Sequence, residues 1–266
     1  MTKKKEICYY CGELATTREH VPPVCLFPEN KDIFKPKIDI GISVFRNNLI
    51  TVPSCKTHNN DKSDDDEYLL SVLAGAVGNN VIAYFHNRTK VKRSLARKGP
   101  RGLDNIMKER EATKWTDKNG HTHDVYKGTL DVKRLINCFE KIARGLYFEE
   151  NKTVFKGECS ILIGFLKYNT DNMENMKLVC EKLFENQSKN FMTKGGNPEI
   201  FTYQFGPVDH LGLIPLKMRF YEGTSVYAAF KPDGVATPYN LAMELINAGI
   251  KTSFRVNNKE TIEFNQ

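Results

Sequence analysis

Two short cysteine motifs near the start of the chain have the spacing of metal ligands. Cys8 and Cys11 form a CxxC, and Cys55 and His58 form a CxxH. A two-residue spacing lets one tight turn direct both side chains at one ion, and three thiolates with one imidazole make a closed tetrahedral set. Such a set leaves no position for water, so the sequence predicts a structural Zn²⁺ site. The alternative is that these residues are unrelated free thiols of a reduced protein.

A second group of reactive side chains lies between the two motifs. Glu19 and His20 are adjacent, and Val21-Pro22 follows them. Neighbouring side chains on a strand point apart, so we expect both to reach one cavity only at a bend into Val21-Pro22. A carboxylate can bind a hard divalent cation, and a neutral imidazole can take a proton from water. The alternative is an unconnected surface pair.

Asn59 directly follows the expected zinc ligand His58. Its side-chain carbonyl offers a second oxygen ligand for a divalent cation. An asparagine near a helix start is also a common helix cap, so both interpretations stay open for this residue.

Residues 8–65 resemble the HNH (ββα-metal) endonuclease family, in the branch built on a treble-clef zinc module. The resemblance implies that His20 is the general base and that Glu19 and Asn59 bind one Mg²⁺ or Mn²⁺. It also implies that Asn48, with Asn47 as an alternative, braces the loop carrying the base. Products of this family have 5′-phosphate and 3′-hydroxyl ends. The chain has Glu19 where the family more often has Asp, and a CxxH where it more often has a CxxC.

Composition sets the broad class of protein. The chain has 266 residues, 40% of them hydrophobic, and a formal net charge of +7. Seven cysteines without an apolar leader favour metal binding or free thiols over a disulfide framework, and a cytoplasmic protein is expected. No apolar run is long enough for a membrane span, so no membrane partner is expected.

The pattern of residues predicts an α+β fold with antiparallel strands after an N-terminal zinc-stapled ββα-metal module. The expected domains are 1–78, the HNH module, and 79–266, which would bind DNA, dimerise or sense a signal. Prolines exclude a long helix before residue 54. The helices are expected at 54–77, 80–110 with a break at Gly99-Pro100, 131–147, 172–191 and 238–248. The strands are expected at 38–44, 48–52, 160–166, 201–205, 213–221, 225–230 and as a pair within 251–264.

One stretch carries a dense positive charge without any acidic residue. Its basic residues are Arg88, Lys90, Lys92, Arg93, Arg97, Lys98 and Arg101. A strip of this kind can follow a phosphate backbone, and it can equally be the solvated face of a helix. The acidic run at 64–67 and the pair His121 and His123 are expected to be solvated surface.

Together these features predict a metal-dependent endonuclease that hydrolyses DNA, of a restriction or antiviral-defence type. RNA as the substrate is not excluded by the sequence, and a homodimer is compatible with it. The alternative is a non-catalytic treble-clef zinc module that binds nucleic acid or protein.

Overall fold

The structure is a computed structural model that describes residues 6–33, 45–59, 63–117, 119–187, 191–209, 212–234, 245–257 and 260–265. Helices and antiparallel sheets are mixed along the chain, which confirms the expected α+β class. The strand expected at 38–44 and most of the helix expected at 238–248 lie outside the described residues. Within the described ranges, no helix combines the length and apolar character needed to cross a bilayer.

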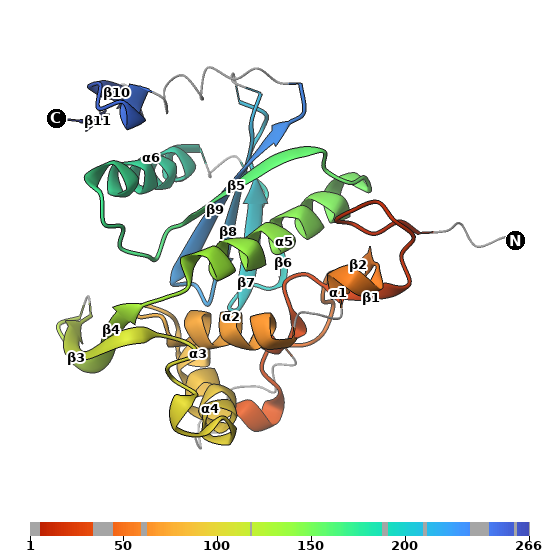
Figure 1. Ribbon diagram of the computed structural model, residues 1–266, viewed down its shortest axis with the longest axis vertical. Helices are drawn as coiled ribbons and strands as arrows, with labels where there is room; N and C mark the ends of the chain where they lie inside the picture. The colour runs from red at the N-terminus through yellow and green to blue at the C-terminus, as the bar shows by residue number, and fades with distance from the viewer. Residues whose placement is uncertain are drawn as a thin grey trace, which may run out of the picture.

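A five-stranded antiparallel sheet forms the centre of the molecule (Figure 1). On β8, Leu216, Met218 and Phe220 alternate with less buried residues and are all 0% exposed. This period of two matches a strand with one face against a helix. A tight turn at Glu222-Gly223 joins β8 to β9 as an antiparallel hairpin. In spatial order the strands are β5 (Gly157–Ile163), β9 (Thr224–Pro232), β8 (Ile214–Phe220), β7 (Phe201–Phe205) and β6 (Lys194–Asn197).

Helix α5 (Val132–Asn151) lies across one face of this sheet (Figure 1). Its apolar stripe follows the predicted helix, and Phe139 and Leu146 within the stripe are fully buried. The Phe139 ring lies 5.7 Å from the Phe220 ring of β8. Asp131 caps the helix by accepting a hydrogen bond from the Arg134 backbone amide. The other face of the sheet packs on α6 (Asp171–Gln187). There the centre of the Phe184 ring lies 5.4 Å from the centre of the Tyr227 ring on β9.

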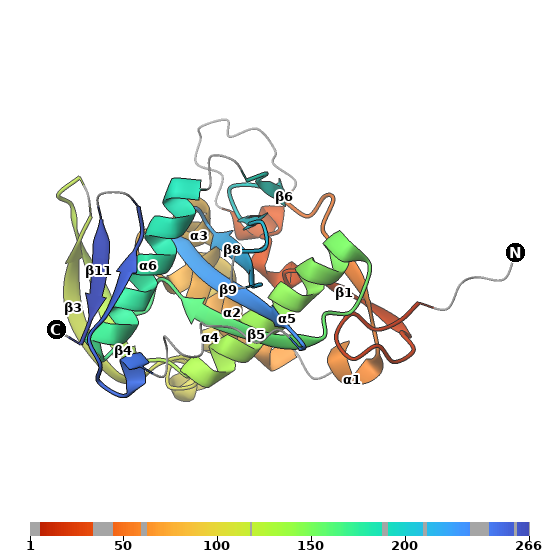
Figure 2. The same ribbon diagram turned by 90° about the horizontal axis from the view of Figure 1, so that it is seen from above.

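A short strand pair follows at the end of the chain, as the sequence predicts. Strands β10 (Thr252–Arg255) and β11 (Thr261–Phe264) are antiparallel. They form a small second cluster with α6, in which Val179 and Phe264 are buried. Figure 2 shows this cluster at the opposite end of the molecule from β1 and α1.

The N-terminal segment consists of two paired strands and two helices. Strand β1 (Thr17–His20) pairs with β2 (Thr51–Ser54) in antiparallel register, with Glu19 opposite Val52. The sequence predicts one helix over 54–77, whereas the structure describes α1 (Lys56–Asn59) and α2 (Ser63–Gly75). Tyr9, Val21 and Leu69 belong to the same buried cluster as Phe139 and Phe220, so residues before and after position 78 share a core. The domain boundary itself stays a prediction.

The stretch after α2 differs from the predicted long helix. It contains α3 (Val81–His86), a π-helical turn (Asn87–Val91) and α4 (Lys92–Arg97), and helical structure ends near Gly99-Pro100. Strand β3 (Lys108–Thr116) already begins within the range predicted to be helical, and it pairs with β4 (Thr122–Thr129). Helix α4 ends just before the Gly-Pro, and Gly99–Arg101 forms a single 3-10 turn before the chain continues to β3. Both strands of this hairpin are largely exposed.

A buried polar network joins α3 to distant parts of the chain. His86 is 0% exposed, and its Nδ1 lies 3.1 Å from Tyr221 Oη, which donates to the Leu26 carbonyl. The Tyr221 hydroxyl proton goes to the Leu26 carbonyl, so His86 Nδ1 carries the hydrogen of this contact, and Nε2 is buried without a partner among the described residues. Thr89 Oγ1 donates to the Asp32 carbonyl, and the Arg93 guanidinium pairs with the Asp32 carboxylate.

His86 predicts a loss of stability in mild acid. Burial, and then the positive charge of Lys90, lowers the pKa of His86 to about 3; Asp32 opposes this, while Arg46 and Arg93 add to it. The unfolded chain binds a proton below its ordinary pKa of about 6.5, whereas the folded chain does not. The free energy of unfolding should therefore fall by about 2 kcal/mol between pH 7.5 and pH 5 on account of this residue.

Urea unfolding of wild type and His86→Gln at both pH values measures this contribution. Acid release of a metal affects both proteins alike, so the difference between the two pH dependences isolates His86. Equal pH dependence in the two proteins would contradict the prediction.

Candidate metal centre and active site

The first cysteine pair lies on a tight turn. The Cys8 amide donates to the Glu13 carbonyl, and the Gly12 amide donates to the Cys8 carbonyl. Gly12 has a φ of +79°, in the left-handed region where a side chain is strained. This closed turn presents the Cys8 and Cys11 sulfurs on one side. The second pair, Cys55 and His58, begins α1 directly after β2.

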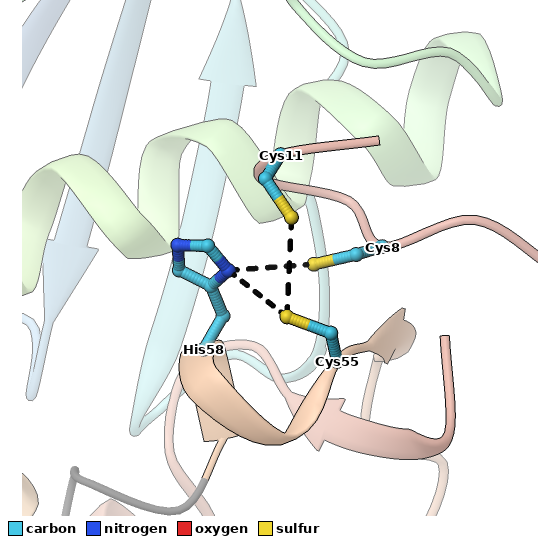
Figure 3. A group of neighbouring side chains, drawn as sticks. All are labelled: Cys8, Cys11, Cys55 and His58. Carbon is cyan, nitrogen blue, oxygen red and sulfur yellow. Dashed lines mark hydrogen bonds between the residues drawn. The ribbon is translucent and has the colours of Figure 1, made fainter. Parts of the chain in front are cut away.

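The four predicted ligands converge (Figure 3). His58 Nδ1 lies 3.8 Å from Cys8 Sγ and 3.2 Å from Cys55 Sγ, and Cys11 Sγ lies 3.9 Å from Cys55 Sγ. All four ligand atoms lie within 4.8 Å of one another. Two sulfurs bound tetrahedrally to one zinc at 2.3 Å would be about 3.8 Å apart, so this donor set fits the ion. The cluster could therefore hold a metal such as zinc.

Packing fixes both halves of the cluster. Cys8 is fully buried, and the Tyr10 ring lies 4.6 Å from the His58 ring. The Tyr9 amide donates to the Pro53 carbonyl, which joins the turn to β2. Cys25, the nearest competing thiol in the sequence, is not part of the cluster, and its Sγ donates to the Asp66 carbonyl instead. With four protein ligands, this centre has the composition of a structural site.

Glu19 and His20 line one pocket beside the metal centre. They are the last two residues of β1, and the chain turns immediately afterwards at Val21-Pro22, whose peptide bond is cis. Both residues belong to the paired part of β1, where neighbouring side chains alternate, yet the lining of this pocket includes both. The residues lining the pocket are Tyr9, Glu19, His20, Val21, Pro23, Asp65, Asp66, Leu69, Cys138, Lys141 and Ile142.

The electrostatic setting of the pocket favours a neutral imidazole. Burial, and then the positive charge of Arg46, lowers the pKa of His20 below its usual value. Glu19 is 7% exposed, and burial followed by the charge of Glu19 raises the pKa of Tyr9 well above its usual value. A neutral imidazole beside a buried carboxylate is the pair that general-base chemistry near neutral pH requires.

Two pocket residues come from the acidic run that the sequence analysis assigns to a solvated face. Asp65 and Asp66 line the pocket, and the Asp65 carboxylate accepts a hydrogen bond of 2.7 Å from Arg134 Nε. Glu67 pairs with Lys98, so this carboxylate is not simply solvated either. Helical spacing could have indicated that Asp65 faces the protein. Asp65 is four positions before the buried Leu69 and shares its helix face.

The two predicted asparagines lie outside this pocket. Asn59 Nδ2 donates to the Arg18 carbonyl at 3.4 Å, so the side chain lies against β1 beside the Glu19-His20 segment. Asn48 adopts a φ of +55° and lines a neighbouring pocket with Pro22 and Asn197. The Asn47 carbonyl accepts a hydrogen bond from Asn197 Nδ2. The structure therefore brings His20 and Glu19 together, places Asn59 against β1, and places Asn48 in a different pocket.

The basic strip contains engaged and exposed residues. Lys90 Nζ donates to the Cys25 carbonyl, Arg93 pairs with the buried Asp32, and Lys98 pairs with Glu67. The charged groups of these three residues are therefore engaged within the protein. The sequence alone does not indicate these contacts. Arg88, Lys92, Arg97 and Arg101 are exposed, and so are Arg93 and Lys98 despite their ion pairs, whereas Lys90 is half-buried. His121 and His123 are exposed as expected, and both lie close to the Asp117 carboxylate.

Comparison with known proteins adds no relative: no protein-family model, no curated protein and no solved structure matches this chain.

Removal of one metal ligand tests the zinc assignment. Cys55→Ser should reduce bound zinc from about one ion per chain to near none, since a three-ligand remnant binds weakly. The turn at 8–12 should then become sensitive to proteolysis, because it loses its attachment to α1. Zinc content by mass spectrometry of the native protein measures the change.

Cys25→Ser is the matched control, since this thiol lies nearby but outside the cluster. It should keep its zinc. Normal folding of Cys55→Ser without metal would count against a structural role.

Proposed function

We propose that this chain is a metal-dependent endonuclease that hydrolyses phosphodiester bonds in DNA. The observation that carries the proposal is the placement of Glu19 and His20 in one pocket next to a convergent Cys3His cluster. A scaffold that only folds around zinc does not need a buried carboxylate and a neutral histidine beside it.

The local order of elements supports the proposal. Strands β1 and β2 are antiparallel, and α1 follows β2 directly, which is the strand–strand–helix order expected of a ββα-metal module. The Cys3His cluster lies where α1 and the 8–12 turn meet. In this interpretation the cluster stabilises the module, and β1 presents the catalytic pair.

The roles follow from the chemistry of the side chains. His20, neutral near pH 7, removes a proton from a water molecule as the water oxygen attacks phosphorus and the bond to the 3′-oxygen breaks. Glu19 would supply a carboxylate ligand to a divalent cation, and Asn59, which lies against β1 outside the pocket, would supply a carbonyl ligand from α1. A bound Mg²⁺ or Mn²⁺ would stabilise the charge that develops on the phosphate and on the leaving oxygen. Asn48 would hold the loop next to Val21-Pro22.

DNA is the proposed substrate because the chain presents positive charge near the pocket helices. Arg88, Lys92, Arg97 and Arg101 are exposed on the stretch that follows α2. Their contacts would be to phosphates and would therefore weaken with rising salt. The same surface accepts RNA phosphates, so the choice of nucleic acid is decided by experiment.

Cleavage of supercoiled plasmid in Mg²⁺ or Mn²⁺ tests the proposal directly. Wild type should nick or linearise the plasmid, and His20→Ala should be slower by roughly 10²–10⁴-fold, the usual contribution of a general base. His123→Ala, which changes an exposed histidine far from the pocket in sequence, should cleave like wild type.

Zinc content must be equal in all three proteins for the comparison to stand. Binding without cleavage by wild type would favour the non-catalytic zinc module. Equal cleavage by wild type and His20→Ala would overturn the assignment of the base.

The pH dependence of cleavage provides an independent test. Only neutral His20 accepts a proton, so activity should fall as pH drops through its pKa, which burial and Arg46 hold below the usual value. The acid limb of kcat/KM should therefore lie below about pH 6.5. Arg46→Gln removes a nearby positive charge and should shift this limb to higher pH. A limb above pH 6.5 in wild type would contradict the role of His20.

A further inference from the structure

The active-site pocket contains one basic side chain that no sequence motif indicates. Lys141, on α5, is the only lysine or arginine among the described residues that line the pocket with Glu19 and His20. It comes from outside the 8–65 segment. Its side chain is 29% exposed, so it lies between the buried face of α5 and the pocket opening.

Helix α5 determines this position. Cys138 and Ile142 are buried and line the same pocket, and Lys141 lies between them on the same face at helical spacing. The long aliphatic part of a lysine can cover apolar neighbours while its ammonium group reaches the polar pocket. A lysine at this position can therefore pack its aliphatic part on the buried neighbours and place its charge in the pocket.

Asp65 holds the ammonium group near the pocket. Lys141 Nζ lies 3.8 Å from Asp65 Oδ2, and Arg134 Nε donates to Asp65 Oδ1 at 2.7 Å. Because Arg134 already satisfies one carboxylate oxygen at close range, the longer contact leaves ammonium protons for another acceptor.

The charge of the pocket indicates what that acceptor is. Glu19, Asp65 and Asp66 place three carboxylates around His20. A phosphate would be repelled by them unless positive charge is present where it enters. Lys141 supplies such a charge from the protein, on the side of the pocket formed by α5.

We infer that the Lys141 ammonium contacts a non-bridging oxygen of the scissile phosphate, with Asp65 as the residue that positions it. The inference rests on the proposed endonuclease function and adds a phosphate-binding residue from the second segment to that site. The 8–65 segment alone would then be an incomplete active site.

Plasmid cleavage by three variants tests the contact. Lys141→Gln should lower kcat/KM by roughly 10–100-fold, the effect of losing one hydrogen bond to a charged group. Lys141→Arg keeps the charge and should recover most of the activity. Lys133→Gln, on an exposed position of the same helix, should match wild type.

A second measurement separates the contact from a purely structural ion pair. The logarithm of DNA affinity should fall less steeply with the logarithm of salt in Lys141→Gln, with a slope smaller by about one. A loss of folded protein lowers the amount that binds but does not change this slope. Wild-type kcat/KM and an unchanged slope in Lys141→Gln would overturn the inference.

The outcomes also distinguish this inference from the proposed function. If His20→Ala is inactive and Lys141→Gln is as active as wild type, only the role of Lys141 is wrong. If His20→Ala cleaves like wild type, the proposed site itself is wrong.

Discussion

The meeting of the 8–12 turn with α1 is the constraint on which the N-terminal segment depends. Cys11 and Cys55 are separated by 44 positions, and bringing the ends of such a loop together costs roughly 3 kcal/mol in chain entropy. A metal bound by Cys8, Cys11, Cys55 and His58 would offset this cost, because a structural zinc contributes its binding energy to folding. The same closure brings β1 beside β2, and their antiparallel pairing holds Glu19 opposite Val52 and His20 opposite Thr51.

Helix α5 is the second support, and it serves two parts of the molecule at once. One side packs on the central sheet through Phe139, while Gly145 faces Val21. A Cβ at position 145 would lie 2.7 Å from Val21 Cγ2, closer than side chains allow. The segment that follows Glu19 and His20 therefore lies directly against the helix backbone. This close approach explains how a shared core extends from Tyr9 to the sheet.

Local signals in the sequence predicted the parts of the fold that depend on local chemistry. The convergence of Cys8, Cys11, Cys55 and His58, the helix α5 and the strands β7 to β9 are each encoded by residue type and spacing. Pocket membership of Asp65 and Lys141 was not predictable in this way, because it arises where α2 and α5 meet β1 in space. The pairing of Arg93 with Asp32 and of Lys98 with Glu67 has the same origin. Charge in the sequence indicated the strip, but only packing decides which of its members form ion pairs within the protein.

The exposed hairpin of β3 and β4 has a consequence for spectroscopy. The only tryptophan of the chain, Trp115, lies on β3, where its ring is 5.7 Å from His123. A two-stranded hairpin with largely exposed faces has little stability of its own. Tryptophan fluorescence would therefore report the local state of this hairpin. The tyrosines Tyr9, Tyr68 and Tyr221, which are buried in the core, are the intrinsic probes that follow global unfolding.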